Sequence, residues 1–141
     1  MTRIDFHSKV ADKLNYACRL IRKAHAANTP LVVLTEDQAQ LAKIDALLWT
    51  FSEQDFLPHV IAGDEWAPYT PIILTADCEQ LLPHHQALVN LSKRTPTFFA
   101  RFERMFELVA NDAEDLIAGR ERYKYYQQRG YPLSHHVADS P

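Results

Sequence analysis

The chain has 141 residues, of which 47% are hydrophobic and 23% charged, and this is the composition of one ordinary globular domain. Its formal net charge is −3, which excludes a protein that coats duplex DNA through a strongly positive overall field, so any DNA contact should be local or indirect. The amino-terminal residues lack the apolar core of a signal peptide and the apolar runs are too short to span a bilayer, so we expect a cytoplasmic protein.

Short apolar runs alternate with longer amphipathic stretches, which predicts an α/β fold with a mostly parallel sheet. The first half of the chain is expected to form a strand, a helix, a strand and a helix, over residues 2–7, 9–27, 31–34 and 35–49. Thr35 and Gln38 have the spacing of a capping box and would begin the second of these helices.

The second half of the chain is less regular at first, because prolines interrupt residues 50–71 and leave one short predicted strand at 59–61. After it we expect two strands, a helical turn, a strand and a final helix, over residues 72–74, 87–91, 96–102, 105–109 and 111–129. Asn111 and Glu114 would form a second capping box, and Gly130 would end the final helix. Residues 1–131 are therefore predicted to be one three-layer domain with helices on both faces of the sheet, and residues 132–141 a flexible tail.

A nucleotide site on such a fold needs glycines at a strand-to-helix turn, so that backbone N–H groups can approach a phosphate. The chain has only three glycines, and none lies at such a turn. The turn after the strand at 31–34 instead has Glu36 and Asp37, two carboxylates where a phosphate would have to sit. We therefore expect a fold like that of nucleotide-binding domains, without a nucleotide site and without a cofactor.

No group of residues has the spacing of a catalytic or metal centre. The histidine pairs at 84–85 and 135–136 are poor metal ligands, because adjacent side chains diverge. Acidic residues at 112–115 occupy a first helical turn, where the helix dipole stabilises them by about 0.3–1 kcal/mol. Cys18 falls on the apolar stripe of the first helix, and Cys78 has no partner at metal or redox spacing. We expect neither a metal nor a catalytic activity.

A basic and aromatic cluster in the final helix is the most informative feature of the chain. Residues 119–131 hold four Lys or Arg and one Glu, a local charge of +3 within a chain of net charge −3. On a helical wheel, an apolar stripe turns basic partway along one arc, formed by Ala113, Leu116, Ile117, Arg120, Tyr123, Lys124 and Gln127. We expect Arg120, Tyr123 and Lys124 to lie at the edge of the core, where they would bind an anion. The alternative, that these cations only stabilise the end of the helix, stays open at this point.

Several short motifs also occur in an order and spacing known from one family. They are Glu36-Asp37 after the second strand, Trp49, Phe56-Leu57-Pro58-His59 followed by Ala62-Gly63, and Arg120-Glu121-Arg122-Tyr123-Lys124. In these motifs, over most of residues 31–131, the chain resembles the chi subunit of the bacterial DNA polymerase III holoenzyme. That family is a non-catalytic accessory part of the clamp loader, with a fold like nucleotide-binding α/β domains.

The resemblance implies two protein partners and only indirect contact with DNA. Chi pairs with the psi subunit and grips the acidic C-terminal tail of single-stranded DNA-binding protein, which ends in a Pro-Phe carboxylate. By resemblance, Arg120 and Lys124 would bind carboxylates of the tail, while Tyr123 and Trp49 would wall an apolar slot for its last residue. The psi subunit would dock around residues 56–59, with Phe56 as an anchor.

Two residues of the final helix do not fit this resemblance simply. Some relatives have a lysine where this chain has Leu116, which would weaken the electrostatic grip on the tail. Gly119 costs about 1 kcal/mol of helix propensity relative to alanine, with no reason visible in the sequence. Two other functions stay open: an α/β enzyme acting on a phosphorylated small molecule, and direct binding of single-stranded DNA by the final helix.

Overall fold

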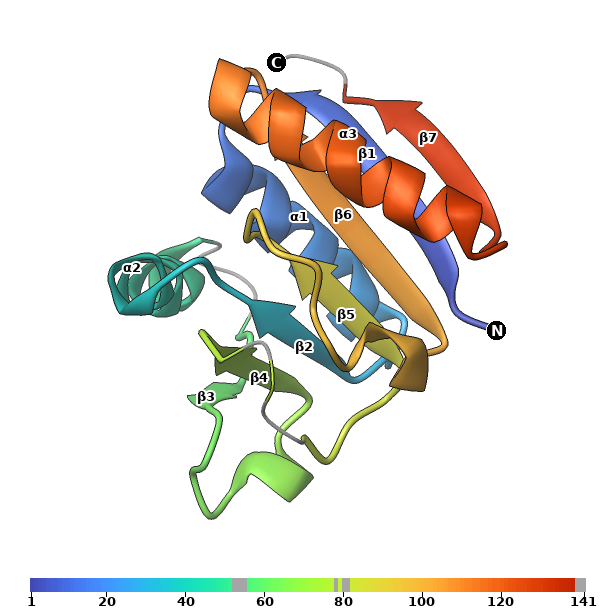
Figure 1. The fold of residues 1–141 in the computed structure, drawn as a ribbon. Coiled ribbons are helices and arrows are strands. Elements are labelled where there is room, and N and C mark those ends of the chain that lie inside the picture. The colour runs from blue at the N-terminus through green and yellow to red at the C-terminus, as the bar shows by residue number, and fades with distance from the viewer. Residues whose placement is uncertain (52–55, 78, 80–81, 139–141) are drawn as a thin grey trace.

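A sheet of parallel strands forms the middle layer of the protein (Figure 1). The computed structural model describes residues 1–51, 56–77, 79 and 82–138, so that Cys78 and residues 139–141 of the predicted tail lie outside it. Over these ranges the sheet has seven strands in the order β3-β4-β2-β5-β6-β1-β7, and every neighbouring pair is parallel. The strands are β1 (Arg3–Val10), β2 (Leu31–Leu34), β3 (His59–Ile61), β4 (Ile72–Thr75), β5 (Ala87–Asn90), β6 (Arg104–Ala110) and β7 (Leu133–Val137).

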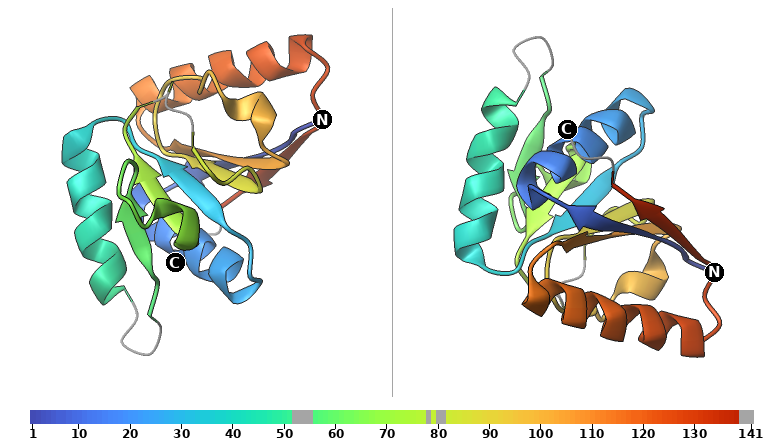
Figure 2. Two further views of the ribbon diagram at one scale, coloured as in Figure 1. Left: turned by 90° about the horizontal axis from the view of Figure 1, so that it is seen from below. Right: turned by 90° about the horizontal axis from the view of Figure 1, so that it is seen from above.

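Helices cover both faces of this sheet (Figure 2). The helices α1 (Lys13–Ala26) and α2 (Gln38–Thr50) lie on one face, and α3 (Ala113–Gln128) lies on the other. Two short 3-10 turns, η1 (Ala67–Tyr69) and η2 (Phe99–Arg101), contribute to the core under α3. The three-layer α/β architecture predicted from the sequence is therefore confirmed, as are the strands expected in it. No helix within the described residues is long and apolar enough to cross a membrane.

The central strands are apolar throughout because both of their faces are covered. All four residues of β2 are fully buried, and they alternate between the two cores. Leu31 and Val33 pack under α1 and α2, while Val32 and Leu34 pack under α3.

The helices begin later than the predicted capping boxes place them. Asp37 is the N-cap of α2, and its carboxylate accepts a hydrogen bond from Gln40 N at 2.8 Å. Asp112 caps α3 in the same way, through Asp115 N. Thr35 and Asn111 are therefore not the caps. In each case an aspartate follows one or two residues later, and its carboxylate is at least as good a hydrogen-bond acceptor as the side chain of Thr35 or Asn111.

The C-terminal residues differ most from the expected flexible tail. Residues 133–137 form β7, which pairs in parallel with β1 from Ile4 to Ser8. The hydroxyl of Ser134 also bonds to the carboxylate of Asp5, and Ser8 Oγ lies 2.6 Å from His135 Nε2. This strand lies at the edge of the sheet and is largely exposed, so it needs no apolar run in its sequence, which is why the pattern missed it.

Gly119 is explained by the contact between α3 and the sheet. A β-carbon at this position would lie 2.8 Å from Val109 Cγ2 and 3.0 Å from Val109 Cγ1 on β6. The glycine therefore lets the helix approach the strand closely. The close packing of α3 on β6 offsets the cost of glycine in helix propensity.

Candidate functional site

A buried polar network fixes how α3 lies on the sheet. Glu107 on β6 is fully buried, and its carboxylate accepts hydrogen bonds from Arg122 Nε at 3.1 Å and from the Tyr126 hydroxyl at 2.5 Å. Asn90 on β5 donates a third, at 2.8 Å. Burial raises the pKa of Glu107, and the charge of Arg122 acts in the opposite direction. Arg122, the middle residue of the basic motif, therefore has a structural role inside the protein.

The inward face of α3 differs from the arc drawn on the helical wheel. The buried residues of this helix are Asp115, Gly119, Arg122 and Tyr126. Ile117, expected in the core, is 58% exposed, so that part of the prediction is wrong. The helical wheel was misleading because we assumed that charged residues face solvent, whereas Arg122 is buried and paired with the buried Glu107.

The three predicted anion-binding residues lie on the outer and lateral sides of α3. Arg120 and Lys124 are exposed, and Tyr123 is half-buried, with its ring 5.1 Å from that of Phe6 in an edge-to-face contact. Neither Arg120 nor Lys124 forms an ion pair with any other residue of the described part of the chain. These two cations are therefore available to a partner.

A pocket of about 340 Å³ lies beside α3, and we call it the α3 pocket. Strands β1 and β6 and the edge strand β7 supply its other sides. Its lining is largely apolar, and its two charged residues are both cations. The lining residues are Phe6, Ser8, Lys9, Val109, Leu116, Gly119, Arg120, Tyr123 and His135. Such a pocket suits an apolar group attached to an anion. Lys124 does not line it, and Lys9 and His135 were not expected in it.

Trp49 does not join this pocket. It lies at the end of α2, on the opposite face of the sheet from α3 (Figures 1 and 2). Its ring lies 4.3 Å from that of His59 and 5.8 Å from that of Phe56. Trp49 and Tyr123 therefore lie apart, and the prediction that they form the two walls of one slot is wrong.

Two exposed aromatic rings lie together at the end of α2 instead. Trp49 is 55% exposed and Phe56 68% exposed, and their ring centroids are 5.8 Å apart. We call this pair the aromatic edge. A second exposed pair, Trp66 and Tyr69, has its centroids 6.4 Å apart at η1, whose Ala67 packs in the core under α3, and no ring contact joins the two pairs among the described residues. Isolated exposed apolar side chains are ordinary, but adjacent large exposed rings are typical of an interaction surface.

The four residues predicted to meet a partner at this edge have different roles. Phe56 is exposed, Pro58 is half-buried, and Leu57 and His59 are buried. His59 Nδ1 lies 2.6 Å from the carbonyl oxygen of Leu57, and its Nε2 lies 3.0 Å from Asp45 Oδ1 on α2. His59 and Leu57 therefore hold the segment in place, and Phe56 is the side chain presented to solvent.

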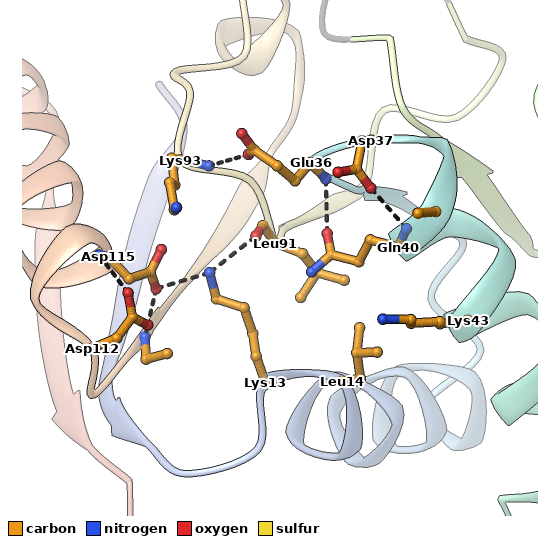
Figure 3. A pocket seen from close by; sticks show the side chains of 12 residues that line it. Lys13, Leu14, Glu36, Asp37, Gln40, Lys43, Leu91, Lys93, Asp112 and Asp115 are labelled. Carbon is orange, nitrogen blue, oxygen red and sulfur yellow. Dashed lines mark hydrogen bonds and ion pairs between the residues drawn. The ribbon is translucent and has the colours of Figure 1, made fainter.

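A further pocket, of about 400 Å³, opens where a nucleotide would bind in this fold class, at the carboxyl ends of the strands (Figure 3). Several groups that could bind a phosphate there are already occupied, although Lys43 on α2, which also lines the pocket, forms no ion pair among the described residues. Glu36 N donates to the side chain of Gln40 at 2.7 Å, and Gln40 N donates to Asp37. Glu36 in turn accepts a hydrogen bond from Lys93 N at 2.7 Å.

Two of the three lysines that line this pocket are paired with carboxylates, Lys93 with Glu114 at 2.8 Å and Lys13 with Asp115. Lys13 Nζ lies 2.9 Å from the carboxylate of Asp115 and donates to the carbonyl of Leu91 at 3.0 Å (Figure 3). Four carboxylates line this pocket, from Glu36, Asp37, Asp112 and Asp115. This surplus of carboxylates makes the pocket a poor site for a phosphate.

Three further candidates for chemistry have contacts within the fold. Burial raises the pKa of the Cys18 thiol to about 12, so it is a packing residue. His84 Nε2 lies 2.6 Å from the carbonyl oxygen of Thr70, and His135 contacts Ser8. Among the described residues there is no group of three His, Cys, Asp or Glu side chains that could hold a metal ion.

Comparison with known proteins agrees with the resemblance read from the motifs. The family model described as "DNA polymerase III chi subunit, HolC" matches residues 1–134. DNA polymerase III subunit chi of Pseudomonas aeruginosa is 32% identical over 96% of both chains. The corresponding subunit of Haemophilus influenzae is 29% identical over 84% of this chain and 82% of its own. That of Escherichia coli is 22% identical over 83% and 80%, respectively. The chain thus belongs to the family of DNA polymerase III chi subunits.

Proposed function

We propose that the protein is a non-catalytic subunit that links the clamp loader to single-stranded DNA-binding protein during replication. It would bind the psi subunit at the aromatic edge and the acidic C-terminal tail of the DNA-binding protein at the α3 pocket. The observation that supports this most strongly is the α3 pocket itself, which combines a largely apolar lining with unpaired cations at its rim.

The chemistry of the tail matches that of the α3 pocket group by group. A terminal phenylalanine side chain would enter between Phe6, Val109 and Leu116, where it loses contact with water. Its carboxylate would meet Arg120, whose guanidinium can donate two parallel hydrogen bonds to a carboxylate. Lys124, one turn further along α3 and outside the pocket, would face the acidic residues that precede the terminus.

The aromatic edge is the surface we assign to psi. Phe56 and Trp49 lie side by side and are both more than half exposed, and neither is charged. Large aromatic side chains supply most of the free energy in many protein interfaces. Trp49 therefore moves, in this proposal, from the tail site to the psi site.

Titration of a short acidic peptide ending in Pro-Phe, followed by calorimetry, tests the tail site. Arg120→Ala should weaken binding by about 1.5–3 kcal/mol, the range for hydrogen bonds to charged groups. Arg19→Ala is the matched control. It removes the same charge from an exposed residue of α1, which lies on the opposite face of the sheet from α3, and it should leave binding unchanged.

Two further titrations distinguish binding of the acidic tail from direct binding of single-stranded DNA. A peptide with an amidated C-terminus should bind more weakly, because the terminal charge is lost. A single-stranded oligonucleotide should not compete with the peptide, whereas competition would favour direct DNA binding by α3. Equal affinities of Arg120→Ala and the unmutated protein would overturn the tail site.

A further inference from the structure

Strand β1 contains an irregularity at the point where it reaches the α3 pocket. Its pairing with β6 is regular from Arg3 to His7 and then shifts register before Val10. Within this bulge Lys9 has a φ of +56°, a left-handed conformation that is strained for a residue with a β-carbon. Bulges re-aim side chains, and this one places both Ser8 and Lys9 in the lining of the α3 pocket.

Lys9 is exposed and its ammonium group is unpaired. No hydrogen bond or ion pair joins it to another residue in the part of the chain that the structure describes. Two other lysines near this end of the sheet are neutralised, Lys13 by Asp115 and Lys93 by Glu114 at 2.8 Å. The bulge thus keeps a free positive charge beside an apolar cavity.

Lys9 and Arg120 approach this cavity from different elements. Arg120 comes from α3 and Lys9 from β1, and no carboxylate lines the space between them. An anion entering the pocket would therefore meet cations from two sides and no competing acid from the lining.

We propose that Lys9 is a second binding residue for the terminal carboxylate of the acidic tail, acting together with Arg120. This inference rests on the proposed function of the α3 pocket. It explains why a strained, non-glycine residue occupies the bulge: the charge is needed there, and glycine, which would relieve the strain, cannot supply it.

The test compares Lys9→Gly with the unmutated protein in peptide titrations. Glycine removes the charge and suits the left-handed backbone, so the variant should fold without loss of thermal stability. Its affinity for the free-acid peptide should fall by roughly two- to fivefold, as for loss of a solvent-exposed ion pair. Lys9→Arg should keep most of the affinity, and Lys43→Ala, which removes a charge from α2 on the other face, should change nothing.

An amidated peptide gives the sharper result. If Lys9 binds the terminal carboxylate, Lys9→Gly and the unmutated protein should bind the amidated peptide equally.

The outcomes separate this inference from the proposal on which it rests. If the unmutated protein binds the free-acid peptide and Lys9→Gly binds it equally well, Lys9 has no such role and the tail site stands. An equal loss for free-acid and amidated peptides would also refute the role given to Lys9. If the unmutated protein does not bind the peptide, both the tail site and the role of Lys9 are overturned.

Discussion

The α3 pocket and the aromatic edge lie toward opposite edges of one sheet and differ in almost every physical respect. The pocket is concave, has cations at its rim, and is built by β1, β6, β7 and the longest helix. The edge is formed by the exposed rings of Trp49 and Phe56 beside β3, and neither residue is charged. A concave charged site suits a short acidic segment, and a set of exposed rings suits the surface of a folded or folding partner. The separation would let both partners bind at once.

The largest expected effect distinguishes two arginines of the same motif. Arg122→Ala would leave Glu107 buried without its cation and should destabilise the protein by about 3–5 kcal/mol in urea unfolding. Arg120→Ala, two residues away and exposed, should change the free energy of unfolding by less than about 0.5 kcal/mol. Similar stabilities of the two variants would contradict the structural role of Arg122.

Loss of the rings of the aromatic edge should weaken binding of psi without changing the stability of the protein. Phe56→Ala and Trp49→Ala should each weaken binding of psi by about 2 kcal/mol or more, since both rings are exposed and adjacent. Copurification and calorimetry with psi measure this loss, and the acidic peptide should still bind normally. Retained psi binding in both variants would move the psi site elsewhere.

Gly119 links the fold to the α3 pocket, because it both packs on Val109 and lines the cavity. Gly119→Ala should destabilise the protein by about 1 kcal/mol net, since crowding of about 1–3 kcal/mol exceeds the gain in helix propensity. In a Val109→Ala background the same substitution should cost less, which a double-mutant cycle of urea unfolding measures. An equal cost in both backgrounds would show that Val109 is not the cause.

The last expected effect is the acid sensitivity of β1, the strand that carries Lys9. Burial and the neighbouring charge of His136 lower the pKa of His7 to about 4. Between pH 6.5 and 4 the unfolded chain takes up a proton that the folded protein does not, so stability should fall as the pH falls through this window. His7→Gln should make this fall in Tm shallower. The lowered pKa of Asp5 acts below its ordinary value of 3.8 and so outside the window.

The sequence predicted the layers well because the central strands are continuous apolar runs and the helices are periodic. It failed where charge is buried. Arg122 on α3 reads as a surface residue until Glu107, fifteen positions earlier, is found opposite it on β6. No local pattern contains that pairing.

The candidate site was predictable in part. Arg120 and Tyr123, predicted from composition and resemblance, line the α3 pocket, and Phe56, predicted from resemblance, is exposed, while their roles in binding stay predictions. Lys9 and His135 were missed because they reach the pocket through a bulge and through an edge strand without an apolar run. Trp49 was assigned to the wrong neighbours, since the sequence does not say which face of the sheet each helix covers.

The central claim is that one domain holds two partners through separate surfaces. The most direct test is calorimetric titration of the acidic Pro-Phe peptide into the free protein and into its preformed complex with psi. The account predicts the same dissociation constant and one peptide per complex in both titrations. Release of psi by the peptide, or loss of peptide binding in the complex, would contradict it.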